Sequence, residues 1–508
     1  MGRDPATVAE WLPQRAALNP DRVAIEFEGR ELTYAELAAQ AARMQASLGA
    51  LGLRPGDRVA TLAQNSPDQV ALLFACAAAR LVMVPLNWRL AAPELEFQLQ
   101  DCGASLLLFG GGLEALARAA AGRPGVPARP LSELEPAPGG PVAAGHPRGA
   151  DPLLIIYTSG TTGTPKGAVL TQANCFWTNL SLDRTAALSG RDVVLQVLPQ
   201  SHVGGWNVQP LLALWHGARL LLEPRFDPGR VLSLIAERRV TTMMGVPTNY
   251  LFLSEDPGFA TADLGSLRMV VVGGAPMPRG LLELWLDRGV TVLQGYGLTE
   301  AAPNVLCVPE EYSRTKVGSA GRPYLHVEVA LATGGGEDPD SALVEGPGTG
   351  ELLVRGPNVF PGYWGRPQAT AEALRQGWLH TGDLAERDQD GFYWLRGRLS
   401  EMYISGGENV YPAEVEEAIG RHPQIAEVVV VGVRDPRWGE VGVGFVVPRE
   451  GAQVDPQQVL AFARERLAGF KVPKEVVVVQ ELPRASEGGK VRRRELKDRW
   501  LASRGSAG

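Results

Sequence analysis

The first 110 residues alternate strand-like and helix-like segments, and this alternation limits the fold more than any other feature. Residues 57–63 (DRVATLA) and 81–86 (LVMVPL) are apolar runs of strand length, and residues 68–79 between them have the composition of a helix. Strand, helix and strand at this spacing are typical of a mainly parallel sheet covered by helices on both faces. The alternation returns from Asp151 to about Val308.

Other segments add detail to this architecture. Thr33 with Glu36 forms a capping-box pattern, which predicts a helix from there to about Gly52. Residues 121–150 contain seven Pro and six Gly, which predicts a surface loop or linker. Short apolar runs between Gly and Pro turns at 317–397 indicate a small β-rich part. After residue 400 the pattern predicts an α+β unit, with helices at 412–421 and 456–468 and strands at 427–433, 441–447 and 475–479.

The composition excludes several classes of protein. The chain has 508 residues with a net charge of −7, a poor electrostatic match for nucleic acid or anionic lipid. No apolar run is long enough to span a membrane, and the first residues lack the apolar core of a signal peptide. The four cysteines are far apart, so neither a zinc site nor a disulfide framework is indicated. We expect a cytoplasmic protein with no nucleic-acid partner and no transmembrane segment; peripheral membrane contact and a homodimer stay open.

Residues 157–167 (YTSGTTGTPKG) form the most specific motif. They follow the apolar run at 153–156, so a strand leads into a loop of glycines and hydroxylated residues that ends at Lys166. Such a loop suits a polyphosphate, because glycines let backbone N–H groups approach and Lys adds a positive charge. It is not a Walker A loop, since Pro165 precedes the lysine and Gly167 follows it. The chain has only six Lys beside 43 Arg, which strengthens the case that Lys166 and Lys490 are chemically required.

This loop resembles that of the adenylate-forming superfamily, which includes acyl-CoA synthetases, luciferases and the adenylation domains of peptide synthetases. Six further motifs follow in that family's order, at 273–276 (GGAP), 294–300 (QGYGLTE), 377–383 (GWLHTGD), 397–398 (GR), 405–412 (SGGENVYP) and 483–490 (PRASEGGK). The resemblance runs from about Thr33 to Glu495. It implies an N-terminal domain at 1–398, built of two doubly wound α/β subdomains plus a small β-rich subdomain. It also implies a mobile α+β C-terminal lid domain at 399–508.

The implied reaction joins a small-molecule carboxylic acid to a thiol, with ATP, Mg²⁺ and coenzyme A. The acid first attacks the α-phosphate of ATP to give acyl-AMP and pyrophosphate, and CoA then displaces AMP. By resemblance, the catalytic residues are Lys490, Thr158, Glu300 and Lys166, and the metal contacts are Thr158 and Glu300. The ATP and AMP contacts would be Thr158, Ser159, Gly160, Thr161, Thr162, Gly163, Lys166, Gly274, Ala275, Pro276, Gln294, Gly295, Tyr296, Gly297, Thr299, Asp383, Arg398 and Lys490.

The second half-reaction implies a rotation of the C-terminal domain, which forms a tunnel for the thiol arm of CoA. The CoA contacts would be Gly406, Gly407, Glu408, Trp438 and Lys471. Two departures from the family pattern accompany these motifs. Ser400 stands at the pivot, with Glu401 in place of a shorter acid, and the segment before Lys490 is one residue longer than usual.

The acid pocket is expected from His202, Val203, Gly204, Trp206, Val246 and Gly273. The pocket segments contain no Asp or Glu besides Glu300, which argues against an amino-acid substrate because a buried ammonium needs a partner. Trp206 would be a gate or a wall, or would only pack, together with His202. The sequence most resembles bacterial medium- and long-chain fatty-acyl-CoA synthetases, so the first expectation is a fatty acid–CoA ligase. The alternatives are an aryl-acid CoA ligase of the benzoate type and a non-catalytic adenylate-binding sensor.

Overall fold

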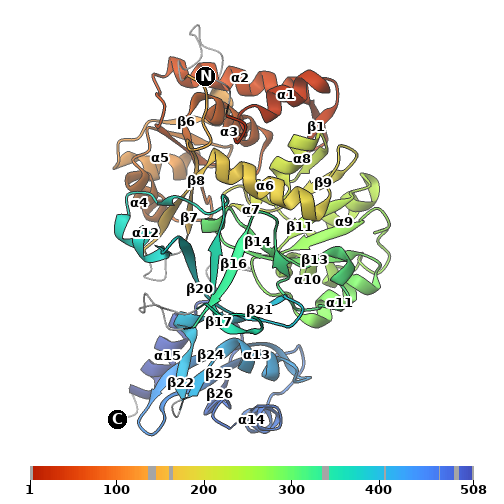
Figure 1. The fold of residues 1–508 in the computed structure, drawn as a ribbon, viewed down its shortest axis with the longest axis vertical. Helices are drawn as coiled ribbons and strands as arrows, with labels where there is room; N and C mark the ends of the chain where they lie inside the picture. Colours follow the sequence, from red (N-terminus) through yellow and green to blue (C-terminus); the bar gives the residue numbers. More distant parts are fainter. Residues whose placement is uncertain are drawn as a thin grey trace. The chain divides into compact units, whose positions relative to one another are not determined.

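The computed structural model describes residues 4–134, 145–158, 164–333, 343–405, 408–467, 469–484 and 491–505. The chain forms two compact units, residues 1–329 with 353–380 and residues 330–352 with 381–508 (Figure 1). The boundary expected after Arg398 concerns a hinge and stays a prediction.

A nine-stranded sheet is the centre of the first unit. Its order is β15 (Arg322–Pro323), β14 (Asn304–Cys307), β13 (Thr291–Gly297), β12 (Met269–Val272), β11 (Thr242–Gly245), β9 (Val193–Gln196), β10 (Arg219–Leu222), β1 (Val23–Phe27) and β2 (Arg30–Thr33). The strands from β13 to β10 are parallel neighbours, and β1 joins them in parallel through β10. Their apolar side chains are buried on both faces, as a covered parallel sheet requires.

Helices cover both faces of this sheet. One face packs against α9 (Pro228–Glu237), α10 (Pro247–Glu255) and α11 (Arg279–Asp287), and their side chains share one buried cluster with those of the strands. The fully buried Trp285 lies in that cluster. Other helices also contact this sheet: α8 (Pro210–His216) contacts β9 and β10, α6 (Gln172–Ala186) contacts β14, and α2 (Tyr34–Ala50) contacts β1 and β2. The helices α1 (Trp11–Leu18) and α7 (Gly204–Asn207) pack against α8.

A seven-stranded sheet is the second large sheet of this unit. Its order is β18 (Gly362–Tyr363), β8 (Lys166–Thr171), β7 (Pro152–Thr158), β4 (Val82–Leu86), β3 (Arg58–Leu62), β5 (Leu106–Phe109) and β6 (Ala128–Pro130). The helices that accompany it are α2 (Tyr34–Ala50), α3 (Pro67–Ala79), α4 (Ala92–Cys102), α5 (Glu114–Gly122) and α12 (Pro367–Ala373). The predicted capping box is confirmed, because Thr33 Oγ1 accepts a hydrogen bond from the Glu36 N–H while the Glu36 carboxylate accepts one from the Thr33 N–H.

The prediction of a loop over 121–150 is wrong for residues 121–133, which include regular structure. The end of α5, the short strand β6 and a 3₁₀ turn at Leu131–Glu133 lie there. β6 pairs in parallel with β5 at the edge of the sheet, where a strand tolerates proline such as Pro130. Leu131 is buried.

A third sheet has the order β16 (Glu328–Ala332), β17 (Gly348–Arg355), β20 (Trp378–Arg387) and β19 (Leu374–Arg375), with β21 (Tyr393–Arg398) paired to β20. It corresponds to the predicted β-rich part.

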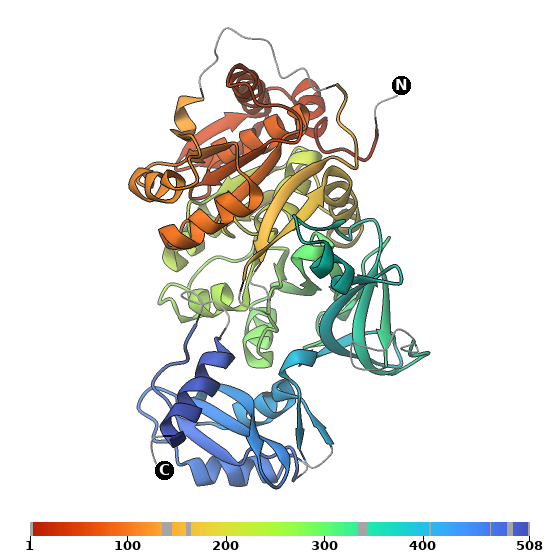
Figure 2. The same cartoon turned by 90° about the vertical axis from the view of Figure 1, so that its left-hand side faces the viewer.

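The rest of the second unit is α+β, as predicted. Its sheet has the order β23 (Glu408–Val410), β22 (Tyr403–Ser405), β25 (Gly439–Pro448) and β24 (Ile425–Asp435), with β26 (Glu475–Val478) paired to β25. One face packs against α13 (Pro412–Gly420) and α14 (Pro456–Arg464), and α15 (Arg493–Gly505) contributes Leu496 and Trp500 to the cluster on the other face (Figure 2).

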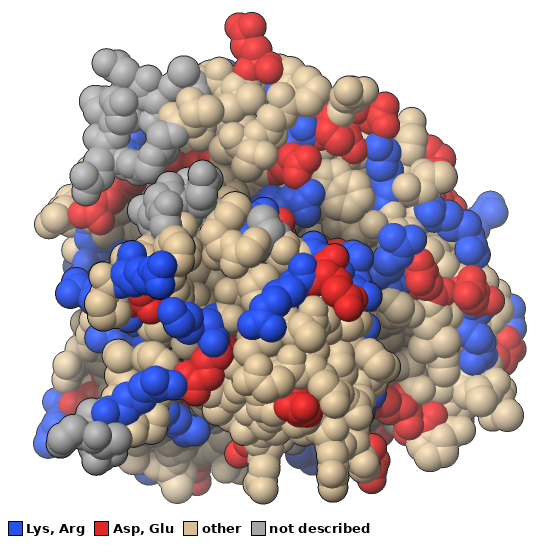
Figure 3. Space-filling model, turned by 90° about the horizontal axis from the view of Figure 1, so that it is seen from below, with Lys and Arg blue, Asp and Glu red and all other residues tan. Residues whose placement is uncertain are grey.

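Among the described residues, no helix combines the length and apolar character that a membrane span requires. On the face drawn in Figure 3, basic and acidic side chains are interspersed.

Candidate active site

Several of the predicted site loops leave the same edge of the nine-stranded sheet. The parallel strands β9, β11, β12 and β13 are consecutive neighbours, and cross-strand pairs at their ends join Gln196 to Met244, Gly245 to Val272, and Val272 to Gln294. The segment that carries His202 and the motifs at 273–276 and 294–300 therefore follow the carboxyl ends of adjacent strands. Ligands in open α/β sheets bind at that edge.

Glycines make the sharp turns at this edge. A Cβ atom on Gly297 would lie 1.9 Å from the carbonyl oxygen of Pro303, so no other residue fits between β13 and β14. Gly274 has a φ of +81°, a conformation that side-chain-bearing residues avoid, and its Cβ position is 3.4 Å from Val246 Cγ1. Both motifs therefore hold their backbone close to neighbouring chain segments.

The phosphate loop connects two antiparallel strands. Thr158, the last residue of β7, pairs with Lys166, the first residue of β8, and Thr158 Oγ1 donates a hydrogen bond of 3.4 Å to the Lys166 carbonyl. A Cβ on Gly167 would lie 2.6 Å from Ile155 Cγ2, so the strand pair is also close-packed at this position. The predicted phosphate contacts at 159–163 lie outside the described residues.

Lys166 at the end of the phosphate loop and Glu300 of the motif at 294–300 both lie next to Tyr363. Tyr363 donates a hydrogen bond of 2.8 Å from its hydroxyl to Glu300 Oε1, and Lys166 Nζ lies 5.4 Å from the centre of its ring. The backbone N–H of Phe360 also donates to the Glu300 carbonyl at 2.9 Å. Tyr363 is not among the residues predicted for the site, because its neighbours along the chain carry no signal of this pairing.

The polar groups present suit a metal that arrives with a nucleotide. Mg²⁺ in nucleotide sites takes one or two carboxylates and fills its other positions with phosphate oxygens and water. Glu300 uses Oε1 for the bond to Tyr363, and among the described residues no donor to its second oxygen is found. No group of three His, Cys, Asp or Glu able to hold a metal occurs in the described part of the chain. The second oxygen of Glu300 fits such a metal, and the expectation that Glu300 and Thr158 hold Mg²⁺ together with ATP stays a prediction.

In the second unit, Asp383 and Arg398 face each other across β20 and β21. Their backbones form a register pair, and Arg398 Nε lies 2.7 Å from Asp383 Oδ1. Arg398 Nη1 also donates to the Thr381 carbonyl, and Thr381 Oγ1 accepts a bond of 3.0 Å from the Asp383 N–H. The carboxylate and the guanidinium predicted to bind the nucleotide thus form a preorganised pair.

The residues predicted for the acid pocket differ in exposure. Water reaches the His202 imidazole, yet burial in the surrounding protein lowers the pKa of His202, and the Arg89 guanidinium lowers it further. Trp206 is fully buried, and its Nε1 donates a hydrogen bond of 2.6 Å to the Gln200 carbonyl. Trp206 is thus fixed by packing, and a role in the acid pocket stays a prediction.

Of the residues predicted to contact CoA, the structure describes the side chains of Trp438 and Lys471, both in the second unit. Trp438 is exposed, and the Asp435 carboxylate accepts hydrogen bonds from the N–H groups of Arg437 and Trp438, which fixes the turn between β24 and β25. These two bonds lower the pKa of Asp435. Lys471 Nζ lies 2.6 Å from Glu414 Oε1. The predicted contacts Gly406, Gly407 and Lys490, and the side chain of Glu408, lie outside the described residues.

Comparison with known proteins decides the family. The model of the AMP-binding enzyme family matches residues 12–364, and that of the AMP-binding enzyme C-terminal domain matches 414–489. The chain belongs to the AMP-binding enzyme family. The predicted membership and fold class are confirmed.

Named relatives of this family cover almost the whole chain. A feruloyl-CoA synthase from an Amycolatopsis species is 45% identical over 96% of this chain and 99% of its own length. An indoleacetate–CoA ligase from Aromatoleum aromaticum is 41% identical over 96% of this chain and 97% of its own. Both names contain an aromatic acid and CoA.

Solved structures of the family share the fold. An o-succinylbenzoate CoA synthetase from Bacillus subtilis, in complex with its acyl-adenylate intermediate, has a TM-score of 0.86 and 33% identity and covers 96% of this chain and 98% of its own. A fatty acyl CoA synthetase from Mycobacterium tuberculosis has a TM-score of 0.79 and 35% identity and covers 98% and 99%. The relatives and structures named here, at 33–45% identity over nearly the whole chain, are CoA ligases, and they differ in the acid that their names give.

The structure therefore brings together part of the predicted AMP-binding site in each unit. In the first unit it places Lys166 and Glu300 around Tyr363, and in the second it pairs Asp383 with Arg398. Gln294 is buried, and its side-chain amide donates to the Ser319 carbonyl at 2.9 Å, which fixes the start of its motif. Nucleotide contacts for these residues, the expected cytoplasmic location and a homodimer stay predictions.

Proposed function

We propose that this AMP-binding enzyme is an ATP-dependent ligase that joins an aromatic carboxylic acid to coenzyme A. The observation that carries the proposal is the identity of 45% to a feruloyl-CoA synthase over nearly the full length of both chains. The relation to an indoleacetate–CoA ligase supports the same substrate class. A purely adenylate-binding sensor is less consistent with this, because Lys166, Glu300 and Asp383 are all present.

The chemistry of the pocket segments supports an uncharged acyl group. The segments at 199–206, 244–247 and 273–277 contain no Asp or Glu. A substrate ammonium buried there would have no carboxylate partner, which is costly. The lowered pKa of His202 keeps its imidazole uncharged at pH 7, so this side chain adds no positive charge to these segments.

In the first half-reaction, the substrate carboxylate attacks the α-phosphate of ATP, and pyrophosphate leaves. Mg²⁺, when bound with ATP, would neutralise part of the phosphate charge. Lys166 would add positive charge from the phosphate loop, and Glu300 would orient the metal through its free oxygen. Catalysis of phosphoryl-centre chemistry rests mostly on such positioning and electrostatic stabilisation. Asp383 would accept the ribose hydroxyls and hold the adenosine in place.

In the second half-reaction, the CoA thiol attacks the acyl carbonyl of acyl-AMP, and AMP leaves. By the family pattern, Lys490 serves the first step, whereas the loop at Gly406 and Gly407 serves the second. The exposed Trp438 offers a face for the adenine of CoA, and the turn that Asp435 fixes holds it in place.

A fatty acid is the second candidate substrate. The specific observation in its favour is the fatty acyl CoA synthetase from Mycobacterium tuberculosis, with a TM-score of 0.79 and 35% identity. A fatty acid is also the first expectation from the sequence motifs. We rank the fatty acid second because the sequence identity of the fatty acyl CoA synthetase to this chain is ten percentage points lower than that of the feruloyl-CoA synthase.

A panel of acids tests the proposal. Ferulate, indoleacetate, benzoate and fatty acids from hexanoate to palmitate are supplied with ATP and Mg²⁺, and AMP release is measured with and without CoA. We expect CoA-dependent AMP release, with kcat/KM at least tenfold higher for one of the aromatic acids than for any fatty acid. A fatty acid ahead by the same margin would replace the aromatic substrate. AMP release at the same rate with and without CoA would reject the ligase function.

A further inference from the structure

Tyr363 lies where two distant parts of the chain meet. Its strand β18 pairs with β8, with Tyr363 opposite Ala168, and the next residue, Trp364, donates its N–H to the Gly167 carbonyl at 2.8 Å. This register puts Tyr363 beside the end of the phosphate loop. The Tyr363 N–H donates to Thr370 Oγ1 at 3.0 Å, which fixes the backbone from the other side.

The segment before Tyr363 is fastened to the turn that carries Glu300. Asn358 is buried, and its amide donates to the carbonyls of Ala301 and Asn304 at 3.0 and 3.1 Å. The Phe360 N–H donates to the Glu300 carbonyl, and the Phe360 ring packs edge-on against Tyr363 with 4.9 Å between ring centres. Tyr363 therefore has a fixed place relative to both the phosphate loop and Glu300.

The two charges beside Tyr363 are opposite, and Tyr363 engages each of them differently. Its hydroxyl donates to the Glu300 carboxylate, and a hydrogen bond to an ionised acceptor is stronger than one between neutral groups. The face of its ring attracts the Lys166 ammonium. Among the described residues, no carboxylate lies within 4.0 Å of Lys166 Nζ, so Lys166 and Glu300 do not pair with each other. A direct ion pair between them would occupy the groups that ATP and Mg²⁺ need.

We propose that Tyr363 is a positioning residue of the ligase. It aims the Glu300 carboxylate at the metal–nucleotide site through its hydroxyl, and it keeps the Lys166 ammonium apart from that carboxylate through its ring. The proposal rests on the proposed function, since Glu300 and Lys166 act on ATP there. It predicts that the hydroxyl and the ring have separable effects.

Calorimetric binding of ATP in the absence of any acid tests this, because no chemistry takes place. Tyr363→Phe removes the hydroxyl that donates to Glu300 and keeps the aromatic ring. We expect its ATP affinity to fall about tenfold at saturating Mg²⁺, equivalent to about 1.4 kcal/mol, and to stay within twofold of wild type without Mg²⁺. Tyr363→Leu removes the ring as well, and should also weaken ATP binding without Mg²⁺.

Two further variants separate positioning from stability. Tyr34→Phe is the matched control, since it loses a tyrosine hydrogen bond of 2.7 Å to the Ala218 carbonyl at a buried place outside the candidate site. It should leave ATP binding unchanged. Glu300→Gln combined with Tyr363→Phe completes a double-mutant cycle. If Tyr363 acts through Glu300, the second substitution adds less than twofold to the first.

Three results would overturn the proposal. Tyr363→Phe with wild-type affinity at every Mg²⁺ concentration would remove the role of its hydroxyl. Equal weakening with and without Mg²⁺ would mean that Tyr363 supports the nucleotide pocket in general. A wild-type chain that binds no ATP would reject the proposed function itself, and the role of Tyr363 with it. Wild-type binding that depends on Mg²⁺ therefore separates failure of this proposal from failure of the function.

Discussion

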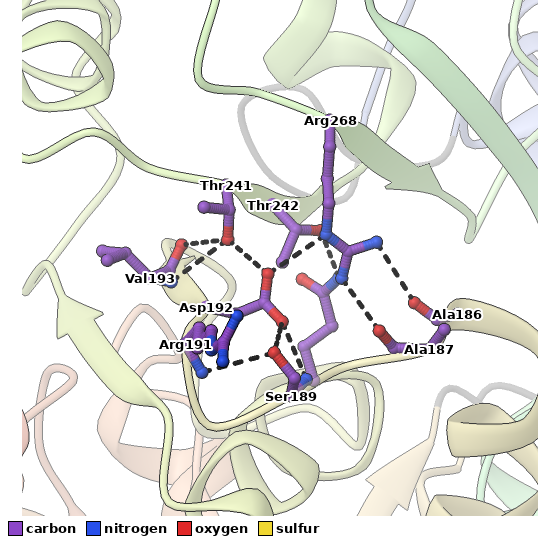
Figure 4. Close-up of polar contacts among 10 residues, drawn as sticks. Ala186, Ala187, Ser189, Arg191, Asp192, Val193, Thr241, Thr242 and Arg268 are labelled. Carbon is purple, nitrogen blue, oxygen red and sulfur yellow. Dashed lines mark hydrogen bonds and ion pairs between the residues drawn. The ribbon is translucent and has the colours of Figure 1, made fainter.

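Replacement of Asp192 should lower the stability of the first unit and leave its chemistry unchanged. Asp192, Thr241 and Arg268 are the residues directly before the parallel strands β9, β11 and β12 (Figure 4). The Asp192 carboxylate accepts hydrogen bonds from the N–H and hydroxyl of Ser189 at 2.7 and 3.0 Å, from Thr241 Oγ1 at 2.8 Å and from Arg268 Nε at 3.1 Å. One carboxylate therefore joins the amino ends of three strands, at the edge opposite to the candidate site.

The size of the effect follows from these contacts. Breaking a buried ion pair costs about 3–5 kcal/mol, and the lower end applies because the Arg268 side chain is 37% exposed. Asp192→Ala should thus cost about 3 kcal/mol. The unfolding entropy grows with chain length, so a unit of more than 300 residues changes its melting temperature by about 1–2 °C per kcal/mol. Differential scanning calorimetry should show a loss of roughly 3–6 °C.

The pH dependence is a second check of the same reasoning. Burial acts to raise the pKa of Asp192, but the bonds from Arg268, Thr241 and Ser189 outweigh it, so the pKa is lowered from its ordinary value of 3.8. A lowered pKa gives stability that is present above the unfolded value and lost as the pH falls through the folded value. The difference between wild type and Asp192→Ala should be constant from pH 7 to about 5 and shrink below about pH 4.

Matched measurements make the reasoning refutable. Asp192→Asn keeps the shape and one acceptor, and should lose about half as much stability. ATP affinity should be unchanged in both variants, since the site loops leave the other end of these strands. An Asp192→Ala protein that melts within 1 °C of wild type, or whose deficit is still undiminished well below about pH 4, would show that the carboxylate network does not hold the sheet.

Substitutions at three further residues, Asp383, Lys490 and Gly297, test the site. Asp383→Ala should weaken ATP binding by tenfold or more in a folded protein, because a charge-assisted bond of about 1.5–3 kcal/mol is lost, and an unchanged ATP titration would remove it from the site. Lys490→Ala should lose most ATP–pyrophosphate exchange, yet it should still convert supplied acyl-AMP and CoA to thioester. Equal slowing of both steps would mean that this lysine is structural. Lys490→Arg should also lose exchange, because its guanidinium is planar and does not replace a compact ammonium. Gly297→Ala should abolish exchange, because its Cβ would overlap the Pro303 carbonyl, whereas Gly280→Ala, which has open space on a helix, should retain it; equal exchange in both would contradict the requirement for glycine.

Local patterns predicted most elements of the fold. The capping box at Thr33 and Glu36 and the elements at Val82–Leu86, Pro412–Gly420 and Ile425–Asp435 occur where the sequence indicates them, within a few residues. Such signals lie within one segment, so spacing and composition carry them. The phosphate loop was also found at the end of a strand, since an apolar run beside glycines is a local pattern.

Contacts between distant segments could not be predicted in the same way. The N-terminal strand β1 pairs with β10, almost two hundred residues further along the chain. Tyr363 reaches Glu300 and Lys166 only because β18 pairs with β8. No periodicity specifies which strands become neighbours, and an ordinary tyrosine in a short strand carries no sign of its partner. The sequence therefore identified the charged groups of the site, whereas the side chain between them became visible only in the fold.

The fold also shows what the longer acid Glu401 contacts at the predicted hinge. Glu401 Oε2 lies 3.1 Å from Arg493 Nε, and the guanidinium of Arg493 also bonds both oxygens of Glu416 and the Val430 carbonyl. Burial acts to lower the pKa of Arg493, but the two carboxylates outweigh it and raise the pKa. A glutamate reaches one methylene further than the aspartate usual in relatives, so the longer acid fits an ion pair within the second unit. Since Arg493 follows Lys490 by three residues, this pair links the predicted hinge to the segment that carries the proposed adenylation lysine.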